Sequence, residues 1–217
     1  MFMTNKILVI CIILILLLYI FKKKKEDFNM PEFEVTVINK FLNDNEINII
    51  LSNCKDFKDS TIISEQGNIS SSYRTSKTCV LEKGSISYNL IFKKLKMLNL
   101  ENYNMEDLQL TKYKEGEFYK SHYDFFDHNK ESEKNIINSN GQRLKTIFVY
   151  LKKAELGGGT RFNRINKEFN ISNGDALYWN NCYKTNDSYI YEESSEHEGM
   201  PVLKGEKIGL NIWLIDK

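Results

Sequence analysis

The sequence lacks several features that would assign a protein class at once. Its 217 residues carry 30 basic and 29 acidic side chains, so the formal net charge is only +1. A chain without a strong overall field gives no indication of a nucleic-acid partner or of an acidic one. No internal repeat is visible, which argues against a repeat architecture. The length fits one folded domain with a short appendage.

Cysteine is scarce, and its spacing gives no sign of a metal site. The four cysteines are Cys11, Cys54, Cys79 and Cys182. No C-x-x-C pair occurs, which argues against a structural zinc site. Cys11 falls in an apolar run, so at most one disulfide can form among the other three. The sequence does not indicate which pair would form it.

The amino terminus contains an unbroken apolar run, Ile7 to Phe21, followed at once by Lys22 to Lys25. As a helix the run would span roughly 22 Å. With lysines reaching out at both ends, residues 1–25 would cross a bilayer core of about 30 Å. We therefore expect a single-pass N-terminal membrane anchor, with a cleaved signal peptide as the alternative. We interpret residues 26–32 as a linker and residues 33–217 as the folded domain.

The sequence leaves open which side of the membrane this domain occupies. Clustered lysines tend to stay in the cytosol, which favours the cytosolic face. Glycosylation sequons at Asn68, Asn170 and Asn186 would suit a lumenal domain instead. Such sequons arise by chance in a chain rich in Asn and Ser, so they carry little weight.

The sequence pattern of the folded part changes from helical to β-prone along its length. Two amphipathic helices are expected first, over 44–57 and 84–100. Short β-prone runs separated by Gly and Asn clusters come next, at 108–114, 118–126, 144–152, 174–179 and 207–215. The polar segment 127–142 is expected to be a mobile loop. The pattern predicts a mainly β domain with flanking helices (α+β), whose β-rich core, 105–217, closes as a sandwich or barrel.

Histidine is also rare, and one of the three stands in a metal-binding pattern. The histidines are His122, His128 and His197. His122 and Asp124 are two residues apart, and residues i and i+2 of a strand point to the same face. A distant second histidine would complete a set of two imidazoles and one carboxylate, which leaves positions of Fe(II) open for oxygen chemistry. Zinc uses overlapping ligands and stays an alternative on spacing alone.

His197 is the stronger candidate for the second histidine because a lysine lies ten residues downstream of it. His197 precedes the last β-prone run, and Lys207 opens that run. At the start of a strand Lys207 would ordinarily be a solvated lysine. Beside an iron site, its ammonium would supply the cation that the distal carboxylate of a bound 2-oxoglutarate needs.

Taken together, these residues resemble the prolyl 4-hydroxylases of the 2-oxoglutarate dioxygenase superfamily. The resemblance covers about 74–213 and rests on motifs that occur in the family's order. They are Arg74-Thr-Ser76, Tyr113-x-x-Gly116-x-x-Tyr119-x-x-His122-x-Asp124, Arg143-Leu-Lys-Thr146, Gly157-Gly158-x-Thr160-x-Phe162, Gly174-Asp-Ala-Leu-Tyr-Trp179, His197-x-x-x-Pro201-Val-x-x-Gly205-x-Lys207 and Trp213. Lysyl hydroxylases, oxygen-sensing prolyl hydroxylases and nucleic-acid demethylases typically carry arginine where this chain has Lys207.

The resemblance implies a double-stranded β-helix with flanking helices, and it implies roles for eight residues. The iron ligands would be His122, Asp124 and His197. The residues around 2-oxoglutarate would be Lys207, Tyr113 and Thr146. The residues facing a peptide substrate would be Tyr119 and Trp213. Plain aromatic packing is the alternative interpretation of the three aromatic residues, and an ordinary strand position that of the threonine.

The implied reaction is hydroxylation of peptidyl proline to 4-hydroxyproline in proline-rich or collagen-like substrates, with succinate and CO2 released. Its cofactors and cosubstrates would be Fe(II), 2-oxoglutarate, O2 and ascorbate. The family resemblance favours the lumen of the endoplasmic reticulum. Two alternatives stay open: a dioxygenase acting on another side chain or a small molecule, and a non-enzymatic β-barrel binding module with a vestigial metal site.

Overall fold

A computed structural model describes residues 10, 12–18, 31–64, 67–69, 72–186 and 188–216. The chain divides into two units, Met1–Glu32 and Phe33–Lys217. In the first unit, residues 12–18 are helical and exposed. No helix within the described ranges has the length and apolarity that crossing a membrane requires. Most of the predicted anchor, residues 1–25, lies outside those ranges, so the anchor stays a prediction.

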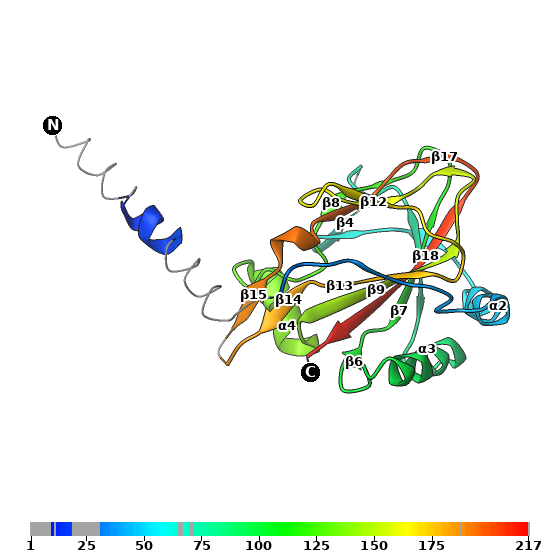
Figure 1. The fold of residues 1–217 in the computed structure, drawn as a ribbon, viewed down its shortest axis with the longest axis horizontal. Helices are drawn as coiled ribbons and strands as arrows, with labels where there is room; N and C mark the ends of the chain where they lie inside the picture. Colours follow the sequence, from blue (N-terminus) through cyan, green and yellow to red (C-terminus); the bar gives the residue numbers. More distant parts are fainter. Residues whose placement is uncertain are drawn as a thin grey trace. The chain divides into compact units, whose positions relative to one another are not determined.

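An eight-stranded antiparallel sheet, the main sheet, organises the second unit (Figure 1). In spatial order its strands are β1 (Thr36–Ile38), β13 (Ala176–Asn180), β9 (Arg143–Lys152), β18 (Lys207–Ile215), β7 (Leu108–Tyr113), β5 (Lys77–Leu81) and β2 (Lys58–Asp59), with β6 (Asn104–Met105) also paired to β18. The two longest strands, β9 and β18, are neighbours at its centre. Four of these eight strands, β7, β9, β13 and β18, were predicted from their β-prone runs, whereas β1, β2, β5 and β6 were not.

A smaller four-stranded sheet, the minor sheet, lies above the main sheet in Figure 1. Its strands, in spatial order, are β12 (Lys167–Phe169), β11 (Thr160–Phe162), β16 (His197–Gly199) and β8 (Tyr119–His122). Three two-stranded ribbons complete the β-structure: β10 (Leu156–Gly157) with β17 (Val202–Lys204), β14 (Cys182–Lys184) with β15 (Tyr189–Tyr191), and β3 (Ile62–Ser64) with β4 (Gly67–Ile69). The single 3₁₀ turn among the described residues, η1 (Glu193–Ser195), leads into β16.

Strand β9 shows why the core has two layers. Its residues Ile147, Val149 and Leu151 belong to the large cluster that also contains the helical residues. Phe148 and Tyr150 belong to a second, aromatic cluster with residues of β11 and β13. Successive side chains of a strand point to opposite faces, so β9 is buried on both. The aromatic cluster therefore joins the inner faces of the main and minor sheets.

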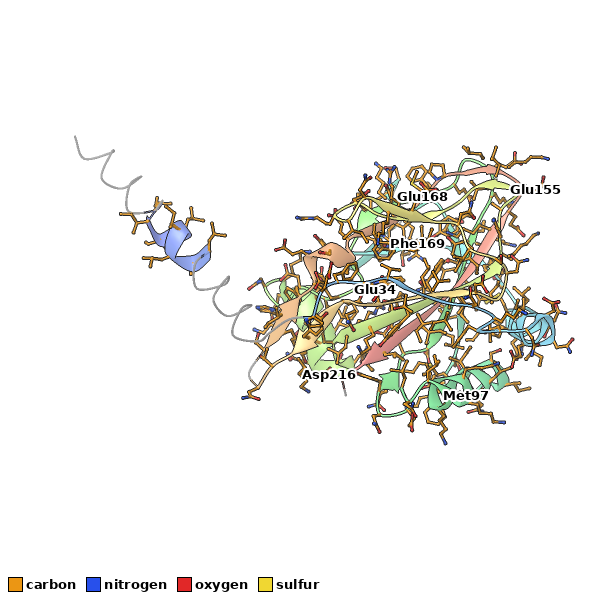
Figure 2. The ribbon with its side chains drawn as sticks, viewed as in Figure 1. Glu34, Met97, Glu155, Glu168, Phe169 and Asp216 are labelled. Carbon is orange, nitrogen blue, oxygen red and sulfur yellow. A yellow bond between two sulfur atoms is a disulfide. The ribbon has the colours of Figure 1, made fainter. Side chains whose placement is uncertain are left out.

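Helices α2 (Asp44–Asn53) and α3 (Ile86–Met97) contribute buried residues to the large cluster on the outer face of the main sheet. α2 begins with a capping box, in which the side chains of Asn43 and Glu46 each accept a hydrogen bond from the other's backbone N–H. Both helices end earlier than predicted. Met97, at the end of α3, is 77% exposed and points away from the sheet (Figure 2).

The prediction of a mobile loop over 127–142 is wrong, because the segment contains helix α4 (Glu131–Asn140). Its only apolar residues, Ile136 and Ile137, are half-buried, and two residues are too few for a helical period to be recognised in the sequence. Two acidic residues in the first turn suit the positive end of the helix dipole. Gly141, with φ of 95°, ends the helix in a conformation that glycine adopts readily.

A disulfide joins Cys54, at the end of α2, to Cys79 on β5. Cys182 is free and buried. The structure thus supplies the pairing that the sequence left undecided. The bridge ties a helix on the outer face of the main sheet to one of the strands beneath it.

Replacing both bridged cysteines by serine (Cys54→Ser with Cys79→Ser) is expected to lower the free energy of unfolding by about 3 to 4 kcal/mol. The reason is that the bridge closes a loop across a sequence separation of 25 residues. Urea unfolding with and without reductant measures the effect. Wild type should lose this stability in reductant, and the double variant should not respond. Equal stability of fully reduced and oxidised wild type would contradict the expectation.

Candidate active site

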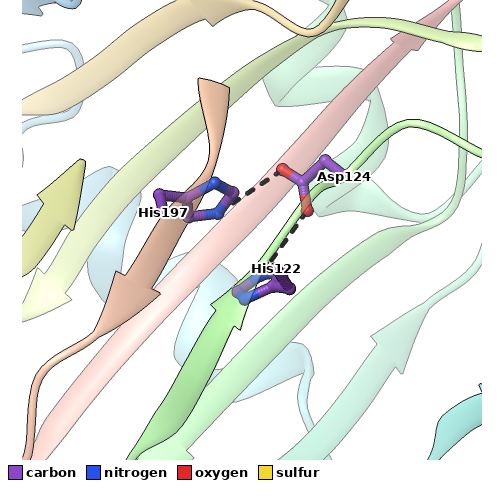
Figure 3. Close-up of side chains that lie close together, drawn as sticks. All are labelled: His122, Asp124 and His197. Atoms are coloured by element: carbon purple, nitrogen blue, oxygen red, sulfur yellow. Dashed lines mark ion pairs between the residues drawn. The ribbon is translucent and has the colours of Figure 1, made fainter. Parts of the chain in front are cut away.

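Strands β8 and β16 bring two histidines together. The strands pair antiparallel, with His122 opposite His197. Asp124 lies just past the end of β8, and Figure 3 shows the three side chains directed toward one another. Each imidazole Nε2 lies 3.9 Å from a different carboxylate oxygen of Asp124. The three predicted ligands therefore converge, whereas His128 is exposed and stands outside the group.

A β-bulge in β8 sets the orientation of the Tyr119 and His122 rings. Tyr119 lies opposite Gly199 and His122 opposite His197, so β8 has one more residue than β16 between these pairs. Residues three apart on a regular strand point to opposite faces. Here the ring of Tyr119 instead stacks on that of His122, with 3.6 Å between centroids. The bulge thus places an aromatic ring directly against a candidate metal ligand.

Backbone hydrogen bonds fix the tautomer of both histidines. Nδ1 of His122 bonds to the carbonyl of Lys120, and Nδ1 of His197 to the carbonyl of Ser195, each at 2.8 Å. A carbonyl only accepts, so each Nδ1 carries the hydrogen and each Nε2 presents a lone pair. Burial, followed by the neighbouring His197, lowers the pKa of His122 to about 3. His122 is therefore neutral and able to bind a cation.

Asp124 is the acidic member of the group. Burial alone would raise the pKa of Asp124, but its neighbours hold that pKa below the usual value. In order of effect, these neighbours are His197, His122, Arg143 and Thr146. Thr146 Oγ1 donates to Asp124 Oδ2 at 2.7 Å. The carboxylate is therefore ionised and held in one orientation.

This donor set fits a divalent first-row metal ion. Two donors that bind one ion at about 2.1 Å lie within about 4 Å of each other. The imidazole-to-carboxylate separations of 3.9 Å meet this limit, and no pair of the three ligand atoms is more than 4.8 Å apart. Two imidazoles and one carboxylate on one side of an ion form the set typical of non-haem Fe(II) oxygenases.

Lys207 is a buried cation without a carboxylate partner among the described residues. Lys207 opens β18 and is only 2% exposed. Its Nζ donates to the hydroxyls of Tyr150, at 3.3 Å, and Thr160, at 3.4 Å. Burial lowers the pKa of the Lys207 ammonium to about 7. Because buried charges in proteins are normally paired, this arrangement indicates a site for an anion.

The surroundings of Lys207 contain further hydroxyl groups. Tyr150 and Thr160 hydrogen-bond to each other at 2.9 Å, and the Tyr150 hydroxyl donates to the carbonyl of Phe169 on β12. Tyr113 lies opposite Lys207 in the β7–β18 register and is buried. Within the described part of the chain, the Tyr113 hydroxyl makes no hydrogen bond. It is therefore a free donor beside the same cation.

Sequence reasoning missed Tyr150 and Thr160 as site residues. Thr160 stands in one of the quoted motifs, and Tyr150 in the β-prone run 144–152. Neither position signals by itself which face of its strand it occupies. Only the packing of β9 and β11 onto each other turns both hydroxyls toward Lys207.

The remaining predicted residues lie next to the metal ligands or their supports. Thr146 bonds to Asp124 and accepts from Asn181 Nδ2 at 2.8 Å, so its contact with 2-oxoglutarate stays a prediction. Tyr119 is partly exposed, and burial raises the pKa of its hydroxyl to about 12. Trp213 is 6% exposed, with the Arg143 guanidinium 3.5 Å above its ring. Peptide contact by these two aromatic residues also stays a prediction.

Comparison with known proteins identifies the class of site. Residues 108–215 match the family model of the 2OG-Fe(II) oxygenase superfamily. The chain belongs to this superfamily. A predicted prolyl 4-hydroxylase of Acanthamoeba polyphaga mimivirus is 28% identical over 202 residues, which cover 89% of this oxygenase and 81% of the viral protein. Prolyl 4-hydroxylase subunit alpha-1 of Caenorhabditis elegans is 32% identical over 153 residues, which cover 69% of this oxygenase but only 26% of the subunit.

A solved structure supports the fold directly. The viral collagen prolyl hydroxylase of Paramecium bursaria Chlorella virus-1, in complex with 2OG, is 26% identical with a TM-score of 0.64. The match covers 83% of this oxygenase and 94% of that chain. The expected double-stranded β-helix is confirmed. With its intact His-Asp-His set, the chain is a 2OG-Fe(II) oxygenase, so iron is preferred over zinc and catalysis over a vestigial site.

Thr146→Val is expected to weaken Fe(II) binding by about tenfold, because residues that orient metal ligands typically contribute that much to affinity. The change removes the hydrogen bond to Asp124 while keeping the side-chain shape. Thr146→Ser retains the hydroxyl and should bind Fe(II) almost as tightly as wild type. Anaerobic Fe(II) titration measures both. Equal affinity of the valine and serine variants would show that this hydrogen bond does not support the metal site.

Proposed function

We propose that this oxygenase hydroxylates peptidyl proline to 4-hydroxyproline in proline-rich or collagen-like peptides, releasing succinate and CO2. The observation that carries the proposal is a His-Asp-His set, in which Asp124 and His197 are buried, accompanied by the buried and unpaired cation of Lys207. The names of the relatives supply the substrate class: prolyl 4-hydroxylases from a virus and an animal, and a viral collagen prolyl hydroxylase. Because the chain spans only about a quarter of the animal subunit, that protein's activity is not transferred whole.

Iron would be held by His122, Asp124 and His197. The two Nε2 lone pairs and the ionised carboxylate supply three ligands, and three positions stay open. Bound Fe(II), with 2-oxoglutarate and O2, supplies the oxidising chemistry, and ascorbate would keep the iron reduced. The contribution of the protein is to orient the ligands and to exclude water, which the burial of Asp124 and His197 favours.

The distal carboxylate of 2-oxoglutarate would be bound by Lys207. The ammonium would donate a charge-assisted bond to this carboxylate, and the hydroxyls of Tyr150 and Thr160, which accept from Nζ, would orient it. The unpartnered hydroxyl of Tyr113 would donate to the same cosubstrate. Thr146 would contribute at the iron end of the site, by orienting Asp124 through their hydrogen bond. Binding of the dianion would also compensate the cost of burying Lys207.

The target proline would approach over Tyr119, whose ring stacks on His122 and remains partly exposed. A flat aromatic face suits a proline ring and the extended conformation that proline-rich peptides adopt. Trp213 would border the same approach.

The cellular location is also a proposal. The Cys54–Cys79 bridge favours an oxidising compartment. This observation supports the lumen of the endoplasmic reticulum over the cytosolic face, with the N-terminal segment as anchor.

Incubation with Fe(II), 2-oxoglutarate, ascorbate and a panel of proline-rich peptides is expected to add one oxygen atom to proline, read by mass spectrometry. His122→Ala, His197→Ala and Lys207→Ala should each abolish the product, because each removes a ligand or the anion partner. His128→Ala is the matched control and should retain turnover, since His128 lies outside the group. Full turnover by His197→Ala would refute the ligand assignment. Succinate formation without any oxidised peptide would refute the proline substrate but not the oxygenase class.

The KM for 2-oxoglutarate is expected to rise with pH above about 7. Below that pH the Lys207 ammonium is charged and ready to bind a carboxylate. Above it the free enzyme loses the proton, and binding must recover it, which weakens affinity by up to about tenfold per pH unit. Lys207→Arg stays charged and should show a flatter profile, whatever its absolute affinity. A wild-type KM that is constant from pH 6 to 9 would contradict the assignment of Lys207.

A further inference from the structure

The residue immediately before each candidate iron ligand belongs to one hydrogen-bonded group. These residues are Ser121, Tyr123 and Glu196. Two residues of the turn between β11 and β12, Asn163 and Arg164, connect them. The five residues are called the outer network here. None of them belongs to the proposed iron or 2-oxoglutarate sites.

The carboxylate of Glu196 is the centre of the outer network. Its Oε1 accepts from Ser121 Oγ at 2.7 Å, and its Oε2 accepts from Arg164 Nε at 2.9 Å. Arg164 also donates through Nη2 to the hydroxyl of Tyr123 at 3.3 Å. Asn163 Nδ2 donates to Ser121 Oγ at 3.0 Å, and its backbone N–H donates to the carbonyl of Glu196 at 3.3 Å. The arginine side chain therefore links all three residues that precede the ligands.

Regular sheet pairing does not by itself fix the three ligands relative to one another. The ladder between β8 and β16 is broken by the bulge next to the two histidines. Asp124 lies past the end of β8 and belongs to no strand. A bulge leaves backbone groups unpaired and bends the strand, so the local geometry needs other ties. The outer network supplies such ties at the three required positions.

We propose that Arg164 is a positioning residue that holds the three candidate iron ligands in register through Ser121, Tyr123 and Glu196. The inference rests on the proposed assignment of those ligands. Arg164 itself is half exposed, so its removal leaves no cavity in the core. Its ion pairs with Glu196 and with Glu193, at 3.6 Å, are exposed to solvent, and exposed ion pairs contribute little to stability. The effect of Arg164 is therefore expected in metal binding rather than in folding.

Arg164→Ala is expected to raise the Kd for Fe(II) by about tenfold, the lower end of what outer residues of metal sites contribute. The absorption band of the Fe(II)–2-oxoglutarate complex should also shift or broaden, because the ligand arrangement is less uniform. Anaerobic titration of the full chain with Fe(II), in the presence of 2-oxoglutarate, measures both quantities. Arg164→Lys should restore binding in part, since lysine can bond to Glu196 but cannot also reach Tyr123 through a planar fork.

Arg161 provides the matched control. It lies on β11 and pairs with Glu198 on β16, close in sequence to the Arg164–Glu196 pair, and is similarly exposed. Glu198 follows a single ligand, His197, so Arg161 does not link the three residues that precede the ligands. Arg161→Ala should leave the Kd for Fe(II) within twofold of wild type. Glu196→Gln provides an independent test, because it keeps the side-chain shape while weakening the bond to Arg164. It should resemble Arg164→Ala, and the double variant should lose little more than either single one.

The outcomes separate this inference from the metal assignment. If Arg164→Ala and Glu196→Gln bind Fe(II) with wild-type affinity and an unchanged band while His122→Ala does not bind, the positioning role is refuted and the iron site stands. If wild type itself binds no Fe(II), both proposals fail. Thermal unfolding of each apo variant checks folding. Equal loss of affinity in Arg161→Ala and Arg164→Ala would also refute the specific role of Arg164.

Discussion

The pairing of β8 with β16 is the constraint on which the site depends. His122 and His197 are distant in sequence, and they meet only because the two strands run antiparallel with these residues opposite each other. A slip of one residue would turn one histidine to the other face. The bulge beside them and the buried inner face of the minor sheet make this register specific. The meeting of the two histidines is therefore a consequence of strand pairing, whereas Asp124 joins them through its short spacing from His122.

Burial makes the charges of the site depend on binding partners. In water, an aspartate and a lysine would each be solvated and would need no partner. Here Asp124 is ionised between two imidazoles, and Lys207 stands apart from it with only hydroxyl neighbours. Neither side chain forms an ion pair with a permanently charged side chain among the described residues. A dianion on Lys207 and a cation on Asp124 would remove both imbalances, so the electrostatics favour the joint presence of metal and 2-oxoglutarate.

The sequence predicted the parts of the site that carry unusual residue types or familiar spacing. The pair His122 and Asp124 was proposed from strand geometry, and the two side chains do converge, although the strand ends at His122 and Asp124 lies beyond it. The choice of His197 and the role of Lys207 depended on their sequence surroundings and on a family resemblance. Tyr150 and Thr160 could not be found, because their contact with Lys207 depends on how two sheets face each other. The outer network was equally hidden, since Ser121 and Glu196 are ordinary polar residues whose meeting depends on register.

The same reasoning explains the fold predictions. β18 was predicted with its observed bounds because it is long and apolar. The shorter strands β10, β12 and β17 carry two or three residues each, too few for alternation to show. α4 was missed for the opposite reason: it is long enough, but it has only two apolar residues and none that is fully buried, and such a helix resembles a loop in sequence. Prediction thus fails where an element has no buried face or is too short to show its period.

Strand β9 finally connects the two halves of the site. Thr146, Phe148 and Tyr150 are each two residues apart, so all three point to the inner face of β9. The first bonds to Asp124, the last contacts Lys207, and between them Phe148 lies so close to β18 that any side chain at Gly209 would collide with its ring. β9 is hydrogen-bonded on both edges, to β13 and to β18. The distance between the metal end and the cation end is therefore set by a strand at the centre of the main sheet, the part of the fold least free to move.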